Sequence, residues 1–95
     1  MDKELRILIL EDDVNDVELV EHELRKSGVR FQSRRAAGKE EFQSSLAEFA
    51  PDVILSDYRM HDMEGTEAVR LAHEQFPHVP VVIITGAINE ETAVA

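Results

Sequence analysis

The chain has 95 residues, with 20 Asp or Glu against 10 Lys or Arg, so its formal net charge is -10. Leu, Ile, Val and Phe account for 28 residues, which is enough for one packed domain and argues against disorder. The absence of Cys excludes a disulfide scaffold and a Cys-based zinc or redox site. The negative charge argues against direct nucleic acid binding and suits a cation or a basic protein surface.

Membrane and export signals are missing from the sequence. The longest apolar run is far shorter than the ~18 residues of a membrane helix. The charged start, Met1 to Glu4, is not followed by the apolar stretch of a signal peptide. We therefore expect a cytoplasmic protein with no membrane partner.

The first part of the chain predicts a strand, a helix and a second strand. Residues 5–10 form a nearly continuous apolar run, which is typical of a strand buried on both faces. A helix follows, capped by Asp13 or Asn15 and ended by Ser27 and Gly28. Its apolar stripe consists of Val14, Val17, Val20 and Leu24. Residues 29–33 alternate apolar and polar side chains, which predicts a half-exposed edge strand.

The second part continues this alternation. Helices are expected at 39–50 and 64–75, and buried strands at 52–56 and 79–85. Residues 89–92 resemble the capped start of a further helix. The repeated strand-helix order predicts an α/β fold with a parallel sheet, in which ligands bind at the carboxyl ends of the strands.

Chemically useful side chains follow three of the predicted strands. Glu11, Asp12 and Asp13 follow the first buried strand, Asp57 follows the second, and Thr85 ends the third. Oxygen ligands without Cys favour Mg²⁺. A carboxylate beside a bound metal ion and a hydroxyl could receive a phosphoryl group, whose charge the metal would neutralise.

Each of these residues also has an ordinary structural interpretation. Carboxylates after a strand often cap the next helix, and Asp13 can do this alone. Asp57 can be a simple loop aspartate, and Thr85 can be a hydroxyl satisfied at the end of its strand. The metal-site interpretation depends on all three groups falling at the expected positions in the expected order.

The order and spacing of four segments resemble a response-regulator receiver domain of two-component signalling. Residues 7–13 read Ile-Leu-Ile-Leu-Glu-Asp-Asp, and residues 51–60 read Pro-Asp-Val-Ile-Leu-Ser-Asp-Tyr-Arg-Met. Residues 63–65 read Met-Glu-Gly, and residues 80–86 read Pro-Val-Val-Ile-Ile-Thr-Gly. The resemblance implies one receiver domain over residues 1–95, with a flavodoxin-like, doubly wound parallel sheet in the order 2-1-3-4-5.

The resemblance also implies a function in a phosphorelay. Asp57 would accept a phosphoryl group from a histidine kinase or phosphotransfer protein, giving an aspartyl phosphate that switches a partner or output domain. Mg²⁺ would be bound by Glu11, Asp12, Asp57 and the backbone carbonyl of Arg59, and Thr85 would sense the phosphoryl group. Such a domain catalyses only its own phosphorylation and is a signalling domain rather than an enzyme.

Two departures from the family pattern concern the loops around the site. His61 stands where the family usually has Pro, which predicts a less rigid loop. Arg59 and Ala87 occupy positions that tune water access in the family. Because Arg59 can pair with the phosphoryl group and Ala87 cannot orient a water molecule, we expect slow self-hydrolysis.

The third departure is that the sequence given ends at Ala95. The resemblance places the family's fifth strand, fifth helix, phosphate-pairing lysine and switch aromatic beyond that point. We therefore expect an incomplete fold and a 95-residue form that is phosphorylated poorly or not at all. The strand at 79–85 would then present an unprotected edge. This predicts either pairing with a second copy of the chain or further residues after Ala95.

Two other functions remain as alternatives. A phosphotransferase of the haloacid-dehalogenase type would need a second Asp at position 59, where this chain has Arg. A pseudo-receiver would bind proteins without being phosphorylated, as this 95-residue form could. Other charged residues are expected to lie in water, namely Arg34, Arg35 and the acidic face of the first helix with Asp16, Glu18, Glu21 and Glu23.

Overall fold

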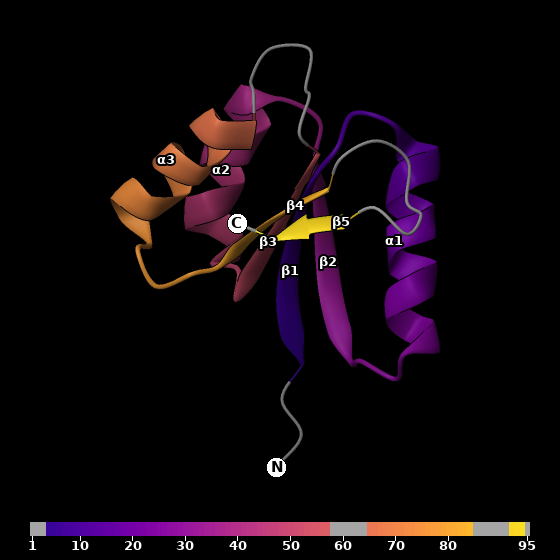
Figure 1. The fold of residues 1–95 in the computed structure, drawn as a ribbon. Helices are drawn as coiled ribbons and strands as arrows, with labels where there is room; N and C mark the ends of the chain where they lie inside the picture. The colour runs from indigo at the N-terminus through magenta and orange to yellow at the C-terminus, as the bar shows by residue number, and fades with distance from the viewer. Residues whose placement is uncertain (1–3, 58–64, 85–91, 95) are drawn as a thin grey trace.

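The structure is a computed structural model that describes residues 4–57, 65–84 and 92–94. The elements in chain order are β1 (Leu5–Leu10), α1 (Val14–Lys26), β2 (Phe31–Ala36), α2 (Lys39–Phe49), β3 (Val53–Asp57), α3 (Gly65–Gln75), β4 (Val81–Ile84) and β5 (Thr92–Val94). They form three layers, with α1 on one face of the sheet and α2 and α3 on the other (Figure 1).

The sheet has the order β2-β1-β3-β4-β5. The pairs β1–β2, β1–β3 and β3–β4 are parallel, as a doubly wound sheet requires. The predicted parallel order 2-1-3-4 of a flavodoxin-like fold is therefore confirmed. No fifth parallel strand occurs among the described residues. The helices in the described ranges are all too short or too polar to span a membrane.

Strand β1 is shared by two apolar cores. Ile7 and Ile9 pack toward α1 with Val17 and Val20, whereas Leu8 and Leu10 pack toward α2 and α3. The division follows from the alternation of side chains along a strand. All four β1 side chains are at most 2% exposed. A slip of one residue would exchange the two sets, so this pattern fixes the register of β1 and the position of the residues that follow it.

Helix α1 begins and ends where the sequence predicts. The Asp13 side chain caps the helix by accepting a hydrogen bond from the backbone N–H of Asn15 at 2.9 Å. Gly28 follows the helix with a φ of 86°, a left-handed conformation that favours glycine. The predicted apolar stripe is wrong at its first position, because Val14 is 52% exposed. Val14 lies in the first turn, ahead of the part of the helix that packs on the sheet.

Strand β2 is an edge strand, as predicted, but it lies further along the chain than residues 29–33. It pairs with β1 from Phe31 to Ala36, with Arg35 opposite Ile9. Arg34 and Arg35 therefore belong to the strand and do not follow it, although both are exposed, as predicted. The backbone pairing offered by the full length of β1 outweighs the side-chain pattern, and the strand ends at the fully buried Ala36.

The C-terminal element differs from the prediction. Thr92 lies in β5, which pairs antiparallel with β4, and not in a helix; Asn89 to Glu91 lie outside the described residues. The prediction of an unprotected edge at β4 is also wrong, because β5 pairs with Val82 to Ile84. Strand pairing satisfies the backbone groups of β4, whereas a short isolated helix is unfavourable. β4 is therefore not the exposed edge of the described sheet, and pairing with a second copy of the chain stays a prediction.

At the amino-terminal end of the sheet, contacts of Arg6 connect neighbouring elements. Its Nε donates to the backbone carbonyl of Phe49 at 2.7 Å, and its guanidinium lies 4.5 Å from the centre of the Phe49 ring. The backbone N–H of Arg6 donates to the Asp52 carboxylate at 2.9 Å. These contacts join β1, the C-terminus of α2 and the residue before β3.

Candidate functional site

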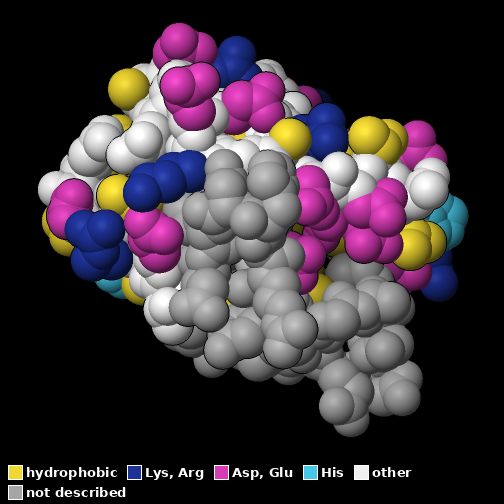
Figure 2. All heavy atoms as spheres, turned by 90° about the horizontal axis from the view of Figure 1, so that it is seen from above, with side chains coloured by type: hydrophobic (Ala, Val, Ile, Leu, Met, Phe, Trp, Pro, Cys, Tyr) yellow, Lys and Arg dark blue, Asp and Glu magenta, His cyan; other side chains and the backbone are white. Residues whose placement is uncertain are grey.

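Three predicted carboxylates meet at the carboxyl end of the sheet. Glu11 and Asp12 directly follow β1, and Asp57 ends β3, the neighbouring parallel strand. One carboxylate oxygen from each of these residues lies within 4.8 Å of the other two. Figure 2 shows this end of the molecule, where several Asp and Glu side chains are exposed. The structure therefore brings Glu11, Asp12 and Asp57 together, as the parallel topology predicts.

Asp13 has a different role from its two neighbours. Its side chain caps α1, and its backbone N–H donates to Oε2 of Glu11 at 3.0 Å. The capping interpretation therefore applies to Asp13, whereas Glu11 and Asp12 belong to the carboxylate cluster. The hydrogen bond also orients the Glu11 carboxylate.

The cluster is electrostatically unfavourable for Glu11. This residue is 8% exposed, and burial is the main cause that raises its pKa to about 7. The N–H of Asp13 lowers the pKa, but the negative charges of Asp57 and Asp16 and a hydrogen bond with Asp12 raise it. Folding therefore favours the protonated form of the Glu11 carboxyl group.

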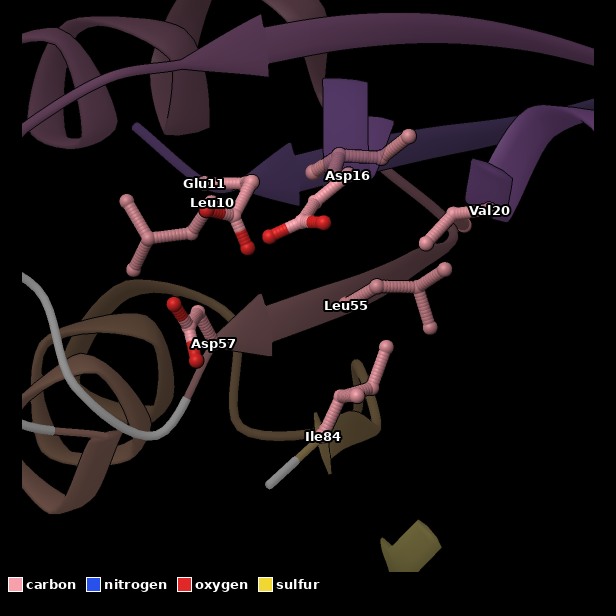
Figure 3. A pocket seen from close by; sticks show the side chains of 8 residues that line it. Leu10, Glu11, Asp16, Val20, Leu55, Asp57 and Ile84 are labelled. Atoms are coloured by element: carbon pink, nitrogen blue, oxygen red, sulfur yellow. The ribbon is translucent and has the colours of Figure 1, made fainter. Parts of the chain in front are cut away.

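Asp16 is a fourth carboxylate at the site that the sequence interpretation missed. It lines a pocket together with Glu11 and Asp57, and Figure 3 shows its carboxylate pointing toward that of Glu11. Burial, followed by the charges of Asp13, Asp57 and Asp12, raises its pKa. The prediction that Asp16 is simply solvated is wrong. Its position four residues before the buried Val20 could have revealed this, because residues at this spacing share a helix face.

The pocket joins these carboxylates to the apolar layer between α1 and the sheet. Apart from the three acidic residues, its lining is apolar: Ile9, Leu10, Val20, Leu55 and Ile84. The carboxylates thus lie on an apolar base. Low polarity around them strengthens their repulsion and their attraction for a cation.

Several predicted site residues fall outside the described residues. These are Arg59, His61, Thr85 and Ala87. The convergence of Thr85 with the carboxylates and the carbonyl ligand from Arg59 therefore remain predictions.

The described donor set fits a hard divalent cation. It consists of carboxylate oxygens, the ligands that Mg²⁺ prefers, and Mg²⁺ usually binds one or two carboxylates and retains several waters. Burial, and to a smaller extent the neighbouring carboxylates, raise the pKa of Glu11, and a bound divalent ion would favour its ionised form. We conclude that Glu11, Asp12 and Asp57 suit Mg²⁺.

The fold and this acidic site agree with a family comparison. The sequence profile of the response regulator receiver domain matches residues 7–95. This chain belongs to that family, whose members are receiver domains of two-component systems.

Individual relatives support the same conclusion. The chain is 30% identical over 88 residues to the DNA-binding transcriptional regulator NtrC of Proteus hauseri, covering 93% of this chain and 18% of that protein. It is 32% identical over 88 residues to the protein-glutamate methylesterase/protein-glutamine glutaminase 3 of Hahella chejuensis, covering 93% of this chain and 25% of that protein. It therefore spans at most a quarter of these curated relatives.

A solved structure shows the same fold. The solution structure of the receiver domain of the PhyR response regulator from Erythrobacter litoralis matches with a TM-score of 0.73 and 29% sequence identity. The match covers 86% of this chain and 63% of that one.

Proposed function

We propose that this receiver domain accepts a phosphoryl group on Asp57 from the phosphohistidine of a histidine kinase or phosphotransfer protein, and thereby switches a partner or output domain. The main observation in support is that Asp57, at the end of β3, lies with Glu11 and Asp12 in one cluster. The family's receiver role supports the same proposal. A cytoplasmic location, where such a kinase domain would deliver the phosphoryl group, is part of it.

The reaction that we propose is a single phosphoryl transfer. A carboxylate oxygen of Asp57 attacks the phosphorus atom and forms the new O–P bond, giving an aspartyl phosphate. The N–P bond of the phosphohistidine breaks, its electron pair remains on the imidazole nitrogen, and that nitrogen takes up a proton. This chain supplies the nucleophile, and the partner supplies the phosphoryl group.

Mg²⁺ is the cofactor that this proposal requires. Glu11, Asp12 and Asp57 would bind it, together with the backbone carbonyl of Arg59. Bound Mg²⁺ would supply positive charge to the phosphoryl oxygens. Hydrogen bonding from the Thr85 hydroxyl would report the phosphorylated state, and this role rests on the family resemblance.

The apolar floor of the site supports the nucleophilic role of Asp57. Its carboxylate faces the Glu11 side of the pocket in Figure 3, with Leu55 and Ile84 also lining that pocket. The low polarity of this lining would strengthen the attraction between the Asp57 carboxylate and a bound cation.

The test is phosphorylation by a small donor. The chain would be incubated with acetyl phosphate and Mg²⁺, and the covalent phosphate measured by intact mass and by its loss in acid or base. Because the family's phosphate-pairing lysine is expected beyond Ala95, we expect only a small fraction of the wild-type chain to gain one phosphoryl group, and none of Asp57→Asn. Asp52→Asn is the matched control, because Asp52 precedes the same strand at the opposite end of the sheet.

Labelling that survives in Asp57→Asn would place the phosphoryl group elsewhere and contradict the proposal. A wild-type chain that binds Mg²⁺ but gains no phosphoryl group, from acetyl phosphate or from a phosphorylated kinase, would instead support the pseudo-receiver alternative.

A further inference from the structure

The guanidinium of Arg35 connects the edge strand β2 to the loop that carries two of the clustered carboxylates. Its Nε donates to the backbone carbonyl of Glu11 at 3.0 Å, and its Nη2 donates to the backbone carbonyl of Asp12 at 3.1 Å. One side chain thus contacts the backbone of two adjacent site residues. A planar guanidinium is suited to this, because its N–H groups form a rigid fork.

The strand register places Arg35 at this position. Arg35 pairs with Ile9 in the parallel ladder, two residues before Glu11. The ladder continues past the end of β1, since the Glu11 N–H donates to the carbonyl of Ala36 at 3.0 Å. Three hydrogen bonds therefore run between the end of β2 and residues 11–12.

The neighbouring arginine has a different partner. Successive side chains of a strand point to opposite faces, and Arg34 pairs with Glu48 of α2 through Nη1 and Oε1 at 3.2 Å. Arg34 and Arg35 thus carry the same charge on adjacent residues, but only Arg35 is hydrogen-bonded to the Glu11–Asp12 backbone in the described contacts. This makes Arg34 a matched control.

We propose that Arg35 is a positioning residue for the divalent ion, because it fixes the backbone from which the Glu11 and Asp12 carboxylates project. The inference rests on the proposed function insofar as Mg²⁺ is the ion at this cluster. Asp13 fixes the other side of the same loop, through its hydrogen bond to Glu11 and its cap of α1. With both sides fixed, the carboxylates are held in place before the ion binds, so less order must be gained on binding.

Arg35 could influence Mg²⁺ affinity through its positive charge or through its hydrogen bonds, and the loss of each would change the affinity in opposite directions. Removing a cation near an acidic cluster strengthens the attraction of the cluster for Mg²⁺. Removing the two hydrogen bonds loosens the loop and weakens binding, and outer-shell partners of metal ligands typically change affinity about 10- to 100-fold. The direction of the change in affinity therefore distinguishes the two roles of Arg35.

The experiment measures Mg²⁺ affinity by isothermal titration calorimetry, without any phosphodonor, on the full 95-residue chain. We expect Arg35→Gln to weaken Mg²⁺ binding about 10-fold, whereas Arg34→Gln, with the same change in charge, leaves it equal or slightly stronger. Arg35→Lys keeps the charge but lacks the fork, and we expect it to weaken binding at least about 3-fold. It also serves as the second variant if Arg35→Gln does not fold.

A second readout follows the loop itself. Amide hydrogen exchange at Glu11 and Asp13 in the metal-free chain should be faster in Arg35→Gln and unchanged in Arg34→Gln, with thermal unfolding showing that both variants are folded. Equal or tighter Mg²⁺ binding by Arg35→Gln, or equal losses in both variants, would overturn the inference.

The outcomes separate this inference from the proposed function. Normal Mg²⁺ binding without phosphorylation of Asp57 would refute only the proposed function. Unchanged Mg²⁺ affinity in the Arg35 variants of a chain that is phosphorylated would refute only the positioning role. A wild-type chain with no Mg²⁺ affinity would overturn both.

Discussion

The charged residues at the two ends of the parallel sheet have different surroundings. At the amino-terminal end, the Arg6 guanidinium has a carbonyl and an aromatic ring of Phe49 as partners, and the Asp52 carboxylate accepts the Arg6 N–H. At the carboxyl end, Glu11 and Asp57 contribute oxygens to one cluster, and the pKa of Glu11 is raised to about 7. Contacts within the chain stabilise the charged groups at the first end, whereas at the second end folding favours the protonated form of Glu11.

This difference separates stability from function within the same strands. Contacts that satisfy polar groups stabilise the fold, whereas a cluster of like charges lowers stability until a ligand offsets it. β1 and β3 extend to both ends of the sheet. Their register fixes the positions of the charged residues at each end, but the contacts of these residues differ between the two ends. Variants at the two ends should therefore have different effects on stability and on metal binding.

The largest effect is expected at the amino-terminal end, for Phe49→Ala. Phe49 is 9% exposed and belongs to the core formed by α2 and α3. Its removal leaves a cavity and deprives Arg6 of its aromatic partner, so we expect a loss of about 3 to 5 kcal/mol in the free energy of unfolding. Urea denaturation measures this loss. Mg²⁺ affinity of the folded fraction should be unchanged, and a parallel loss of affinity would show that the two ends are coupled.

An intermediate effect of the opposite sign is expected at the carboxyl end, for Glu11→Gln. Because the pKa of Glu11 is raised from 4.5 to about 7 on folding, the folded chain binds more protons than the unfolded chain between these values. Wild-type stability should thus fall as the pH rises through this window and level off above it. Without divalent ions at about pH 8, Glu11→Gln should be more stable than wild type by roughly 1 to 3 kcal/mol. The lower value applies if water in the pocket screens the charge of Glu11.

Thermal and urea unfolding from about pH 4.5 to 8 in a chelating buffer checks this sign. Glu18→Gln is the matched control, because Glu18 is exposed on α1 and should leave the slope with pH unchanged. Glu11→Gln should also weaken Mg²⁺ binding, so the gain in stability and the loss of affinity occur together. A wild-type chain that becomes more stable between about pH 5 and 7 would contradict the raised pKa.

The smallest effect is expected for Asp52→Ala, again at the amino-terminal end. The change removes the carboxylate that accepts the Arg6 N–H, and loss of one such hydrogen bond costs about 1 kcal/mol. The urea midpoint should fall slightly, with no change in Mg²⁺ affinity. An effect on metal binding as large as that of Glu11→Gln would remove the distinction between the two ends.

The buried parts of the fold could be predicted because their patterns allow few alternatives. The apolar runs of β1, β3 and β4 are compatible with burial on both faces, and the capped stripe of α1 marks its start at Asp13. The convergence of Glu11, Asp12 and Asp57 then follows from the parallel order of adjacent strands. These inferences need only the period of the pattern and the rule that carboxyl ends share one edge.

The remaining features depend on pairing that local patterns do not encode. β2 pairs with β1 along the whole length of β1. The strand therefore continues through Arg34 and Arg35 and ends at Ala36, opposite Leu10. β5 likewise forms because β4 offers unpaired backbone groups, against the helix signal of a capped acidic start. Asp16 was missed because its acidic neighbours on α1 suggested solvent, although its spacing from Val20 places it on the inner face.

The turn at Gly28 is a suitable position for inserting a label into the protein. Gly28 is exposed and lies in the connection from α1 to β2, with open space on the side where a Cβ would project. It also lies at the opposite end of α1 from the capping Asp13. A short fluorescent or epitope insertion there would lengthen the connection without shifting the β1 register, and so would report on the domain while leaving its acidic end undisturbed.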